Sequence, residues 1–403
     1  MQGSSSSSSS KETKTLFYLL ATCLVSIFFI LSFSRRTPPS PSDPHLHHLR
    51  LNSSSPPPSI AYLLSGSDSD RLLRLLFSIY HPNNRYLLHL DLSAPDHLRR
   101  SLALAVRSVP VFRAAGNVDV VGRPDFANQR GSSALSSTLH GAAILLRLHP
   151  SWDWFINLDA HDYPLVNQDD LLHVMSFLPR DLNFIQHSSR IGWRESRRIK
   201  PIIVDPGLYL SARSDVFYAT QKRELPNAYR IFTGSPSVVL SRKFVEFCIL
   251  GSDNFPRTLL MYYSNTPSSH ANYFHTTVCN SREFNKTTVN YNMHYVSWDN
   301  PPKTDPRLLV LDDFEKMIES GAAFGTQFSS DVPVLDRIDI EVLNRSPGKI
   351  VPGGWCLGEG DDPCTVWGDA NVLRPGSGAK RFEKAIVDLL SNGTFRSQQC
   401  ISE

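Results

Sequence analysis

Polar side chains that could do chemistry follow an apolar run near the middle of this 403-residue chain. Asp159 and His161 stand two residues apart directly after the run WFINL, which predicts a buried strand. A carboxylate and an imidazole at this spacing could hold a divalent metal ion, but a carboxylate after a strand also commonly caps a turn or a helix. Both interpretations stay open for this D-x-H element.

A histidine and a basic stretch are the other candidates. His270, in SSHANYFHT, could accept a proton because an imidazole titrates near neutral pH, or it could be a packed structural histidine. Trp193 lies within the densest basic stretch, whose cations are Arg190, Arg194, Arg197, Arg198 and Lys200. This stretch predicts either a solvated face or a grip on anionic or sugar groups, with the Trp193 ring stacking on a sugar.

Alternating apolar runs and amphipathic segments must position these side chains. The runs predict strands at 60–64, 86–91, 118–121 and 154–158, separated by predicted helices at 71–80, 98–109 and 133–148. Strands separated by helices indicate a mainly parallel sheet covered by helices on both faces. Ligands of such sheets lie beyond the carboxyl ends of the strands, where Asp91, Asp125 and Asp159 stand.

The second half of the chain is less regular and shows no internal domain boundary. It predicts strands at 202–205, 238–240 and 294–298 and helices at 242–250, 312–320 and 380–390. The chain lacks G-x-x-x-x-G-K-[ST] and has no G-x-G-x-x-G after its first strand, so we expect neither nucleoside triphosphate nor dinucleotide binding. Its net charge of +3 and scattered basic residues give no reason to expect nucleic acid.

The N-terminal region predicts a membrane anchor. Residues 1–14, with a serine tract, form an expected cytosolic tail, and the uncharged residues 15–34 are long enough to cross a hydrocarbon layer about 30 Å thick. A cleaved signal peptide is the alternative, but no A-x-A-like site follows Phe33. Residues 35–58 are rich in proline and serine and predict an extended stem, which leaves 59–403 as one lumenal domain.

Sequons and cysteines favour a lumenal body. The sequons stand at Asn52, Asn285, Asn344 and Asn392. Cys23 lies in the predicted anchor, and the five remaining cysteines permit two disulfides and one free thiol. Cys356 and Cys364 bracket a loop short enough for a local disulfide; zinc is the alternative, but no second Cys or His pair stands at ligand spacing. The layout of tail, anchor, stem and lumenal body is typical of Golgi transferases.

A lumenal α/β domain whose strands end in carboxylates fits a nucleotide-sugar transferase. Such an enzyme must neutralise a leaving diphosphate, with a metal ion or with Arg and Lys, and must supply a base for the acceptor hydroxyl. His270 is the candidate base, and the D-x-H element is the candidate metal site. Trp193, Asp205 and Tyr209 are candidates for binding the acceptor, although the D-P-G sequence at Asp205 predicts a turn first.

Ordered motifs across the body resemble a known family. The segments FINLDAHDYPL, IKPIIVDPGLYL, FTGSPSVVLSRKFVEFC, HYVSWDNPP and VPGGWCLG are similar to those of the plant branch of glycosyltransferase family 14, the family of core-2/I-branching enzymes and peptide xylosyltransferases. The resemblance implies a GT-A fold, inverting transfer from a UDP-sugar, Golgi type II topology and catalysis that requires no metal. The plant branch includes β-glucuronosyltransferases, so we expect UDP-glucuronic acid as donor and the galactan chains of arabinogalactan proteins as acceptor. Xylose and N-acetylglucosamine are the alternative sugars.

By motif position, the resemblance also implies a donor site. Its members end the second predicted strand, follow the third, precede the fourth or stand in and after two later segments: Leu90, Asp91, Asp125, Trp152, Asp153, Ser235, Trp298 and Asp299. Tyr273 and Phe274 fall in the family's catalytic helix.

Two departures from the family pattern concern catalysis. The family's general base is a glutamate just before Y-F-H-T; here Ala271 stands at that position, with His270 beside it. The family's Arg-Lys pair, which holds the diphosphate, is replaced by Thr326 and Gln327 in FGTQF. Either His270 and a metal ion at the D-x-H element compensate for these losses, or the chain is a catalytically silent member that binds glycans or partner transferases.

Overall fold

The computed structural model describes residues 56–400 except 212–214, 252, 302, 304, 331, 392–394 and 396–398. The chain divides into two units, Met1–Leu51 and Asn52–Glu403, and the described residues belong to the second. The predicted tail, the anchor and most of the stem lie outside the described residues, as do Asn52 and Asn392. Within the part that the structure describes, no helix is long and apolar enough to cross a membrane.

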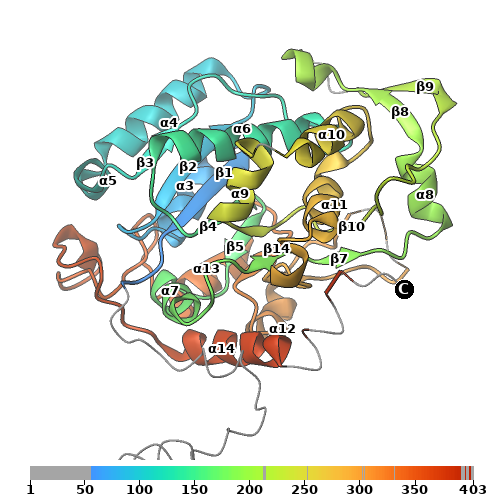
Figure 1. Cartoon of the computed structure of the whole chain (residues 1–403). Coiled ribbons are helices and arrows are strands. Elements are labelled where there is room, and N and C mark those ends of the chain that lie inside the picture. The colour runs from blue at the N-terminus through green and yellow to red at the C-terminus, as the bar shows by residue number, and fades with distance from the viewer. Residues whose placement is uncertain are drawn as a thin grey trace, which may run out of the picture. The chain divides into compact units, whose positions relative to one another are not determined.

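A seven-stranded sheet forms the centre of the described unit, with the strand order β12-β6-β11-β4-β1-β2-β3 (Figure 1). Its parallel central strands are β1 (Ile60–Gly66), β2 (Arg85–Leu90), β3 (Val118–Val120) and β4 (Trp154–Asp159). Beyond β4 lie the antiparallel β11 (Val239–Ser241), then β6 (Asn183–Phe184) and β12 (Thr288–Val289). The predicted α/β class with a mainly parallel sheet is therefore confirmed.

Helices cover both faces of this sheet. Side chains alternate along β1, so Ala61 and Leu63 face one side and Tyr62 the other. The first face shares a buried core with α6 (Ser133–Leu148), α9 (Arg242–Ile249), α10 (Asn254–Tyr263) and α11 (Tyr273–Asn280). On the second face, which α3 (Ser69–Ser78) and α7 (Gln168–Ser176) cover, Tyr62 stacks on Tyr86 with 5.4 Å between ring centroids and donates to Oε1 of Gln168 at 3.0 Å.

Shorter elements complete the unit. The remaining helices are α4 (Asp96–Ser108), α5 (Pro110–Ala115), α8 (Trp193–Ile199), α12 (Phe314–Glu319), α13 (Pro333–Glu341) and α14 (Ser377–Leu390). The 3₁₀ turns are η1 (Pro206–Tyr209), η2 (Ser269–Ala271), η3 (Asn285–Thr287), η4 (Leu311–Asp313) and η5 (Pro363–Thr365). Two antiparallel pairs lie outside the central sheet: β7 (His187–Ser188) with β10 (Thr233–Gly234), and β8 (Pro201–Val204) with β9 (Phe217–Lys222).

A three-stranded sheet and a buried polar network hold the C-terminal part of the chain. The sheet has the order β13 (His294–Val296), β14 (Phe324–Thr326) and β5 (Asp162–Pro164). The Tyr163 hydroxyl of β5 donates to Oδ1 of Asp339 in α13 at 2.5 Å and accepts from Nη2 of Arg345 at 2.9 Å. Oδ2 of Asp339 also accepts from Arg345 at 2.6 Å and from Arg74 of α3 at 2.8 Å.

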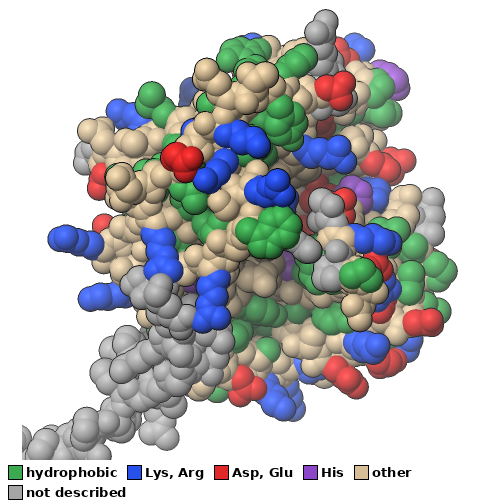
Figure 2. Space-filling view, turned by 90° about the vertical axis from the view of Figure 1, so that its right-hand side faces the viewer, with side chains coloured by type: hydrophobic (Ala, Val, Ile, Leu, Met, Phe, Trp, Pro, Cys, Tyr) green, Lys and Arg blue, Asp and Glu red, His purple; other side chains and the backbone are tan. Residues whose placement is uncertain are grey.

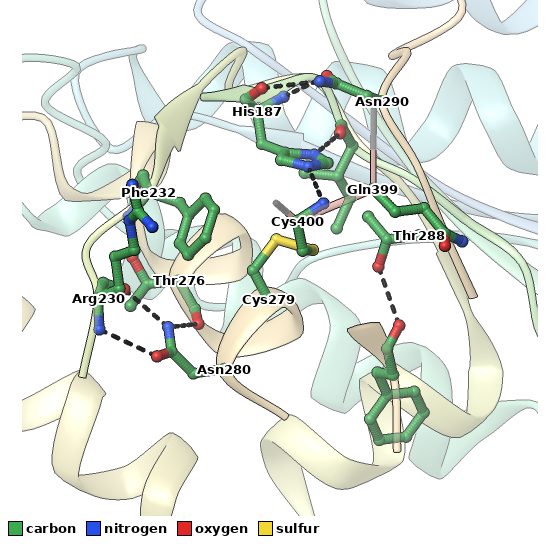
Figure 3. The surroundings of a disulfide bond; sticks show 12 residues. His187, Arg230, Phe232, Thr276, Cys279, Asn280, Thr288, Asn290, Gln399 and Cys400 are labelled. Atoms are coloured by element: carbon green, nitrogen blue, oxygen red, sulfur yellow. Dashed lines mark hydrogen bonds between the residues drawn. A yellow bond between two sulfur atoms is a disulfide. The ribbon is translucent and has the colours of Figure 1, made fainter. Parts of the chain in front are cut away.

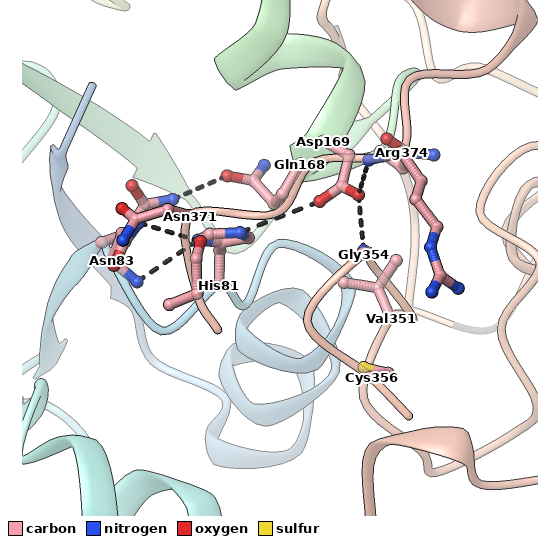
Figure 4. A network of polar contacts seen from close by, with 12 residues as sticks. His81, Asn83, Gln168, Asp169, Val351, Gly354, Cys356, Asn371 and Arg374 are labelled. Atoms are coloured by element: carbon pink, nitrogen blue, oxygen red, sulfur yellow. Dashed lines mark hydrogen bonds and ion pairs between the residues drawn. The ribbon is translucent and has the colours of Figure 1, made fainter. Parts of the chain in front are cut away.

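A second polar network anchors the glycine-rich C-terminal loop to the start of α7 (Figure 4). Asp169 accepts the N–H groups of Gly354 at 2.7 Å and Arg374 at 2.6 Å. Burial raises the pKa of Asp169 and lowers the pKa of His81, whose Nε2 lies 3.8 Å from Asp169 Oδ1, to about 3. His81 is therefore neutral at pH 7, and the loop is fixed mainly by backbone donors.

The cysteines of the described unit form two disulfides, Cys356–Cys364 and Cys279–Cys400. Cys248 is a free thiol, and burial raises its pKa. The predicted local disulfide and the predicted division into two disulfides and one thiol are confirmed. Of the sequons, Asn344 is exposed and Asn285 is half-buried at the start of η3; their glycosylation stays a prediction.

The buried network predicts unequal roles for the two carboxylates that bond to Arg74. Asp339→Asn leaves the buried Arg345 beside an uncharged partner, so we expect the free energy of unfolding to fall by about 3–5 kcal/mol. Asp336 bonds to the same guanidinium at 2.7 Å but is 72% exposed, so Asp336→Asn changes it by less than about 1 kcal/mol. Urea unfolding of the purified chain measures the free energy of unfolding of both variants. Equal losses would contradict the unequal roles of the two carboxylates.

Candidate functional site

Three parallel strands bring their carboxyl ends to one edge of the central sheet, called the carboxyl edge below. β1 pairs with β2 so that Gly66 lies opposite Leu90, and with β4 so that Ser65 lies opposite Asp159. The N–H of Asp91 donates to Gly66 O at 2.8 Å, which keeps Asp91 at the same edge. The structure therefore brings Leu90, Asp91 and Asp159 together, as expected from the rule for parallel sheets.

Asp91 and Asp125 join the loops that follow β2 and β3. The two carboxylate oxygens of the nearly buried Asp91 accept the N–H groups of Ser93 and Ala127, each at 2.8 Å. Asp125 is joined to this loop because its carbonyl accepts the N–H of Leu92 at 3.0 Å. Its carboxylate Oδ2 lies 2.7 Å from Nδ1 of His140 in α6. Asp91 thus stabilises the loop, while Asp125 presents a partly exposed carboxylate near it.

Asp159 is the last residue of β4 and His161 follows two residues later, and both side chains are about half exposed. Their side chains contact each other through Oδ1 and Nδ1, and the N–H of His161 donates to the same oxygen at 2.9 Å. The N–H of Asp159 in turn donates to Oδ2 of Asp162 at 2.8 Å. The Asp159 carboxylate therefore stabilises a local turn. Metal binding by Asp159 and His161 stays a prediction.

The FGTQF segment, where the resemblance implies two cations, lies beside the D-x-H element. Thr326 of β14 pairs with Asp162 of β5, and the N–H of Phe328 donates to His161 O at 2.9 Å, so Gln327 lies between these contacts. Arg71 of α3 donates from Nη2 to Phe328 O at 2.9 Å. Arg71 was not among the predicted site residues, because its position fits the polar face of a helix and Phe328 is 257 positions away in the chain. This arginine brings a guanidinium next to the segment that lacks cations.

Ser235 connects the end of β4 to α11. The Asn157 side chain of β4 donates to the carbonyl of Pro236 at 3.2 Å, which places the Ser235 loop beside that strand. Ser235 Oγ accepts from Nδ2 of Asn292 at 2.8 Å, and Ser235 O lies 2.9 Å from Nε2 of His275 in α11. The predicted donor residue Ser235 is therefore close to the helix that follows the candidate base.

His270 lies in η2, directly before α11. Its Nδ1 is buried and has no hydrogen-bond partner among the described residues. Burial, with the positive charge of Arg198 in α8, lowers the pKa of His270 to about 4. Burial likewise lowers the pKa of the neighbouring His275 to about 3. A neutral His270 has a lone pair at pH 7, so it can accept a proton as a general base must.

Aromatic side chains are exposed near α8 and in the loop after β13. Trp193 is 67% exposed with Arg197 5.7 Å from its ring centroid, Tyr209 is 76% exposed and Trp298 is 51% exposed. Figure 2 shows Lys and Arg side chains gathered around exposed hydrophobic side chains on the face that Figure 1 has at its right, where α8 lies. Asp299 pairs with Lys303 at 2.9 Å. These exposures leave both interpretations of the basic stretch open.

Trp152 and Asp153 lie away from the carboxyl edge, which corrects the prediction that they line the donor site together with Asp91. Both precede β4, and because β4 runs parallel to β1, its start lies at the opposite edge of the sheet. Trp152 is buried, with the Arg242 guanidinium 4.7 Å from its ring centroid. Asp153 Oδ2 accepts the N–H of Ser59, just before β1, at 2.9 Å.

Asp205 does not face an acceptor, which corrects a second prediction. It is 1% exposed, and its Oδ2 accepts the N–H groups of Ser132 and Ser133 at 2.8 Å each, while Oδ1 accepts that of Gly207 at 2.9 Å. A carboxylate at the first N–H groups of α6 is favourable because these groups lack partners within the helix and carry partial positive charge. The turn predicted from D-P-G is confirmed.

Among the described residues, one group of three His, Cys, Asp or Glu side chains brings its ligand atoms within 4.8 Å of one another: His187, Cys279 and Cys400. This group lies at α11 and not at the D-x-H element.

The parallel sheet and the polar loops at its carboxyl edge define an α/β protein whose ligand site is expected at that edge. The family model for the Core-2/I-Branching enzyme matches residues 60–318. The chain belongs to this family of glycosyltransferases.

Curated relatives agree with this assignment. The chain is 53% identical over 356 residues to the β-glucuronosyltransferase GlcAT14A of Arabidopsis thaliana, across 87% of this chain and 80% of that protein. It is 45% identical over 373 residues to GlcAT14C of the same plant, across 92% of each. Human xylosyltransferase 1 is 30% identical over 246 residues, 60% of this chain and 24% of that protein. The solved mouse xyloside xylosyltransferase 1 matches 66% of this chain and 97% of its own at 12% identity, with a TM-score of 0.30.

Asp205 provides a test of its corrected role. Asp205→Ala removes three buried hydrogen bonds to a carboxylate, so we expect the free energy of unfolding to fall by about 2–4 kcal/mol. Asp253→Ala removes the exposed N-cap of α10, where one oxygen accepts the N–H of Phe255 at 2.8 Å, and costs about 1 kcal/mol. Thermal unfolding compares the stability of the two variants. An Asp205→Ala chain as stable as the wild type would contradict the structural role of Asp205 and leave acceptor binding as its role.

Proposed function

We propose that the chain transfers glucuronic acid from UDP-glucuronic acid to the galactan chains of arabinogalactan proteins, with inversion at the anomeric carbon. The observation that carries this proposal is the 53% identity to β-glucuronosyltransferase GlcAT14A over most of both chains. GlcAT14B, another β-glucuronosyltransferase of Arabidopsis thaliana, is 54% identical across 85% of this chain and 80% of its own. The donor sugar is therefore inferred from relatives that cover nearly the whole domain.

His270 is the proposed general base. In the step, the acceptor hydroxyl oxygen forms a bond to C1 of the sugar, the bond between C1 and the diphosphate oxygen breaks, and the hydroxyl proton moves to the imidazole. Ala271 cannot accept this proton, whereas the neutral His270 next to it can. UDP leaves with the electron pair of the broken bond.

The leaving diphosphate needs positive charge or hydrogen-bond donors at the carboxyl edge. Thr326 and Gln327 offer neutral donors, and the Arg71 guanidinium lies beside the same segment. We propose that these groups act without a metal ion, in keeping with the family. The alternative is a divalent cation held by Asp159 and His161, which lie next to this segment.

The proposed setting is the Golgi membrane. Residues 15–34 would form a type II signal anchor, with 1–14 in the cytosol, 35–58 as stem and a lumenal GT-A domain from 59 onward. The two disulfides of the described unit support an oxidising lumen, because such bonds persist in secretory compartments. Within this setting Trp193 and Tyr209 are the proposed acceptor contacts, since both rings are exposed.

A silent member of the family is the second candidate function. It is favoured by one observation, the replacement of the family's glutamate by Ala271 and of its Arg-Lys pair by Thr326 and Gln327. Such a protein would bind a UDP-sugar or a glycan without turnover and could act by recruiting partner transferases.

A donor panel tests the proposed function. The full-length chain, purified in detergent, is incubated with a galactan acceptor and UDP-glucuronic acid, UDP-xylose or UDP-N-acetylglucosamine. We expect transfer from UDP-glucuronic acid, and a loss of about 10²–10⁴-fold in kcat for His270→Ala. His97→Ala, at an exposed histidine of α4, is the matched control and keeps full activity. Binding without turnover would support the silent member instead, and transfer from another sugar would reassign the donor.

The pH profile separates a base from a structural histidine. Because the pKa of His270 is lowered to about 4, kcat/KM should rise with pH through about 4 and stay level up to neutral pH. Removing the nearby positive charge by Arg198→Gln stabilises the protonated ring, so the rise should move to higher pH. An acid limb near the ordinary histidine pKa that is unmoved by Arg198→Gln would contradict the assignment.

Metal dependence distinguishes the two accounts of diphosphate binding. If neutral donors and Arg71 suffice, EDTA and His161→Ala each change the transfer rate by less than about twofold. Parallel losses of about tenfold or more, restored by Mn²⁺ or Mg²⁺ in the EDTA-treated wild type only, would instead establish a metal ion at Asp159 and His161.

A further inference from the structure

A disulfide ties α11 to the segment at Gln399 and Cys400 (Figure 3). The bond joins Cys279, in the last turn of α11, to Cys400 across a separation of 121 residues. Gln399 adds a hydrogen bond from Nε2 to Lys286 O at 2.8 Å. The two sulfur atoms therefore lie where a distant segment returns to the helix that follows His270.

His187 stands beside this disulfide with a defined orientation. Its Nδ1 lies 2.7 Å from Ile185 O, and its Nε2 accepts the N–H of Cys400 at 3.0 Å. Because a carbonyl only accepts, Nδ1 carries the proton and Nε2 the lone pair. The backbone is held as well, since the side chain of Asn290 bonds to both the N–H and the carbonyl of His187, at 2.7 and 2.9 Å.

We propose that Cys279, Cys400 and His187 form a zinc site in the chain whose Cys279–Cys400 bond is reduced. Their ligand atoms lie within 4.8 Å of one another, and His187 and Cys279 are buried. Two thiolates and one imidazole are a ligand set that suits zinc, with water in the fourth tetrahedral position. The bond from Nδ1 of His187 to a backbone carbonyl is the outer contact that typically orients a metal-binding histidine.

The chemistry balances without an additional oxidant. A newly made chain carries both cysteines as thiols, and a folded oxidised chain reaches the same state when a dithiol reduces the bond and becomes a disulfide itself. Zn²⁺ then displaces one proton from each thiol, and Nε2 of His187 exchanges the N–H of Cys400 for the metal ion. Zinc would thereby keep the segment at Cys400 joined to α11 before, or instead of, the disulfide.

The second disulfide of the described unit is a matched control. Cys356 and Cys364 are also a buried pair, but they belong to no group of three metal-ligating side chains among the described residues. Reduction therefore produces two thiol pairs in one molecule. The Cys279 and Cys400 pair has His187 within reach of the same metal ion, and the other pair is the control.

The test is zinc binding by the full-length chain in detergent. The chain is reduced with a trialkylphosphine, which becomes a phosphine oxide by taking oxygen from water, and is then freed of reductant under nitrogen. Zn²⁺ alone is added in competition with a chromophoric chelator. We expect one more Zn²⁺ per chain in the reduced than in the oxidised protein, and a thiolate-to-cobalt absorption band when Co²⁺ replaces Zn²⁺.

Variants assign the site. Cys356→Ser with Cys364→Ser should retain the additional zinc, whereas Cys279→Ser with Cys400→Ser should lose it and His187→Ala should weaken it by about tenfold or more. If the Cys279 and Cys400 variant does not fold, the oxidised wild type serves as the zinc-free comparison. No difference between reduced and oxidised wild type, absence of the cobalt band, or loss of zinc in the Cys356 and Cys364 variant would each overturn the proposal.

Discussion

The parallel pairing of β1 with β2 and β4 is the constraint on which the candidate site depends. Backbone hydrogen bonds fix Gly66 opposite Leu90 and Ser65 opposite Asp159, so two loops leave the sheet at the same edge. A slip of one residue would turn the side chains of β1 to the wrong faces, and both faces are buried. The register is therefore strongly specified, and the loops that carry Asp91 and Asp159 inherit its precision.

Contacts from the C-terminal part of the chain complete this edge. β14 brings Thr326, with Gln327 directly after it, beside Asp162, and the buried pair of Asp339 and Arg345 holds α13 to the neighbouring Tyr163. The network of Asp169 in Figure 4 fixes the glycine-rich loop to the start of α7. The site is thus assembled from segments far apart in the chain.

Strong periodicity made part of this fold predictable. The helix predicted at 133–148 is observed as Ser133–Leu148, and the strand predicted at 154–158 as Trp154–Asp159. The helix α7 was missed because it is only nine residues long and its first polar residues, Gln168 to Asp170, are buried, so burial does not follow side-chain polarity there. The expected strand at 202–205 does form, but as β8 in a hairpin outside the central sheet.

The site was predictable where it follows from strand direction, and unpredictable where it depends on distant contacts. The position of Asp159 follows from the rule that ligands lie beyond the carboxyl ends of parallel strands. The cap formed by Asp205 joins residues 73 positions apart in the chain, and the partner of Cys279 lies 121 positions away, so neither is visible in local sequence. Trp152 was misplaced because a motif gives position along the chain and not the edge of the sheet.

Photo-crosslinking of the full-length chain with an azido-substituted UDP, followed by peptide mapping, tests the central claim most directly. If the nucleotide binds at the carboxyl edge, the labelled peptides contain Asp91, Asp125 or Ser235, and excess UDP abolishes the label. Labelling confined to the peptide that begins β4, at Trp152 and Asp153, would place the nucleotide at the opposite edge and contradict this account.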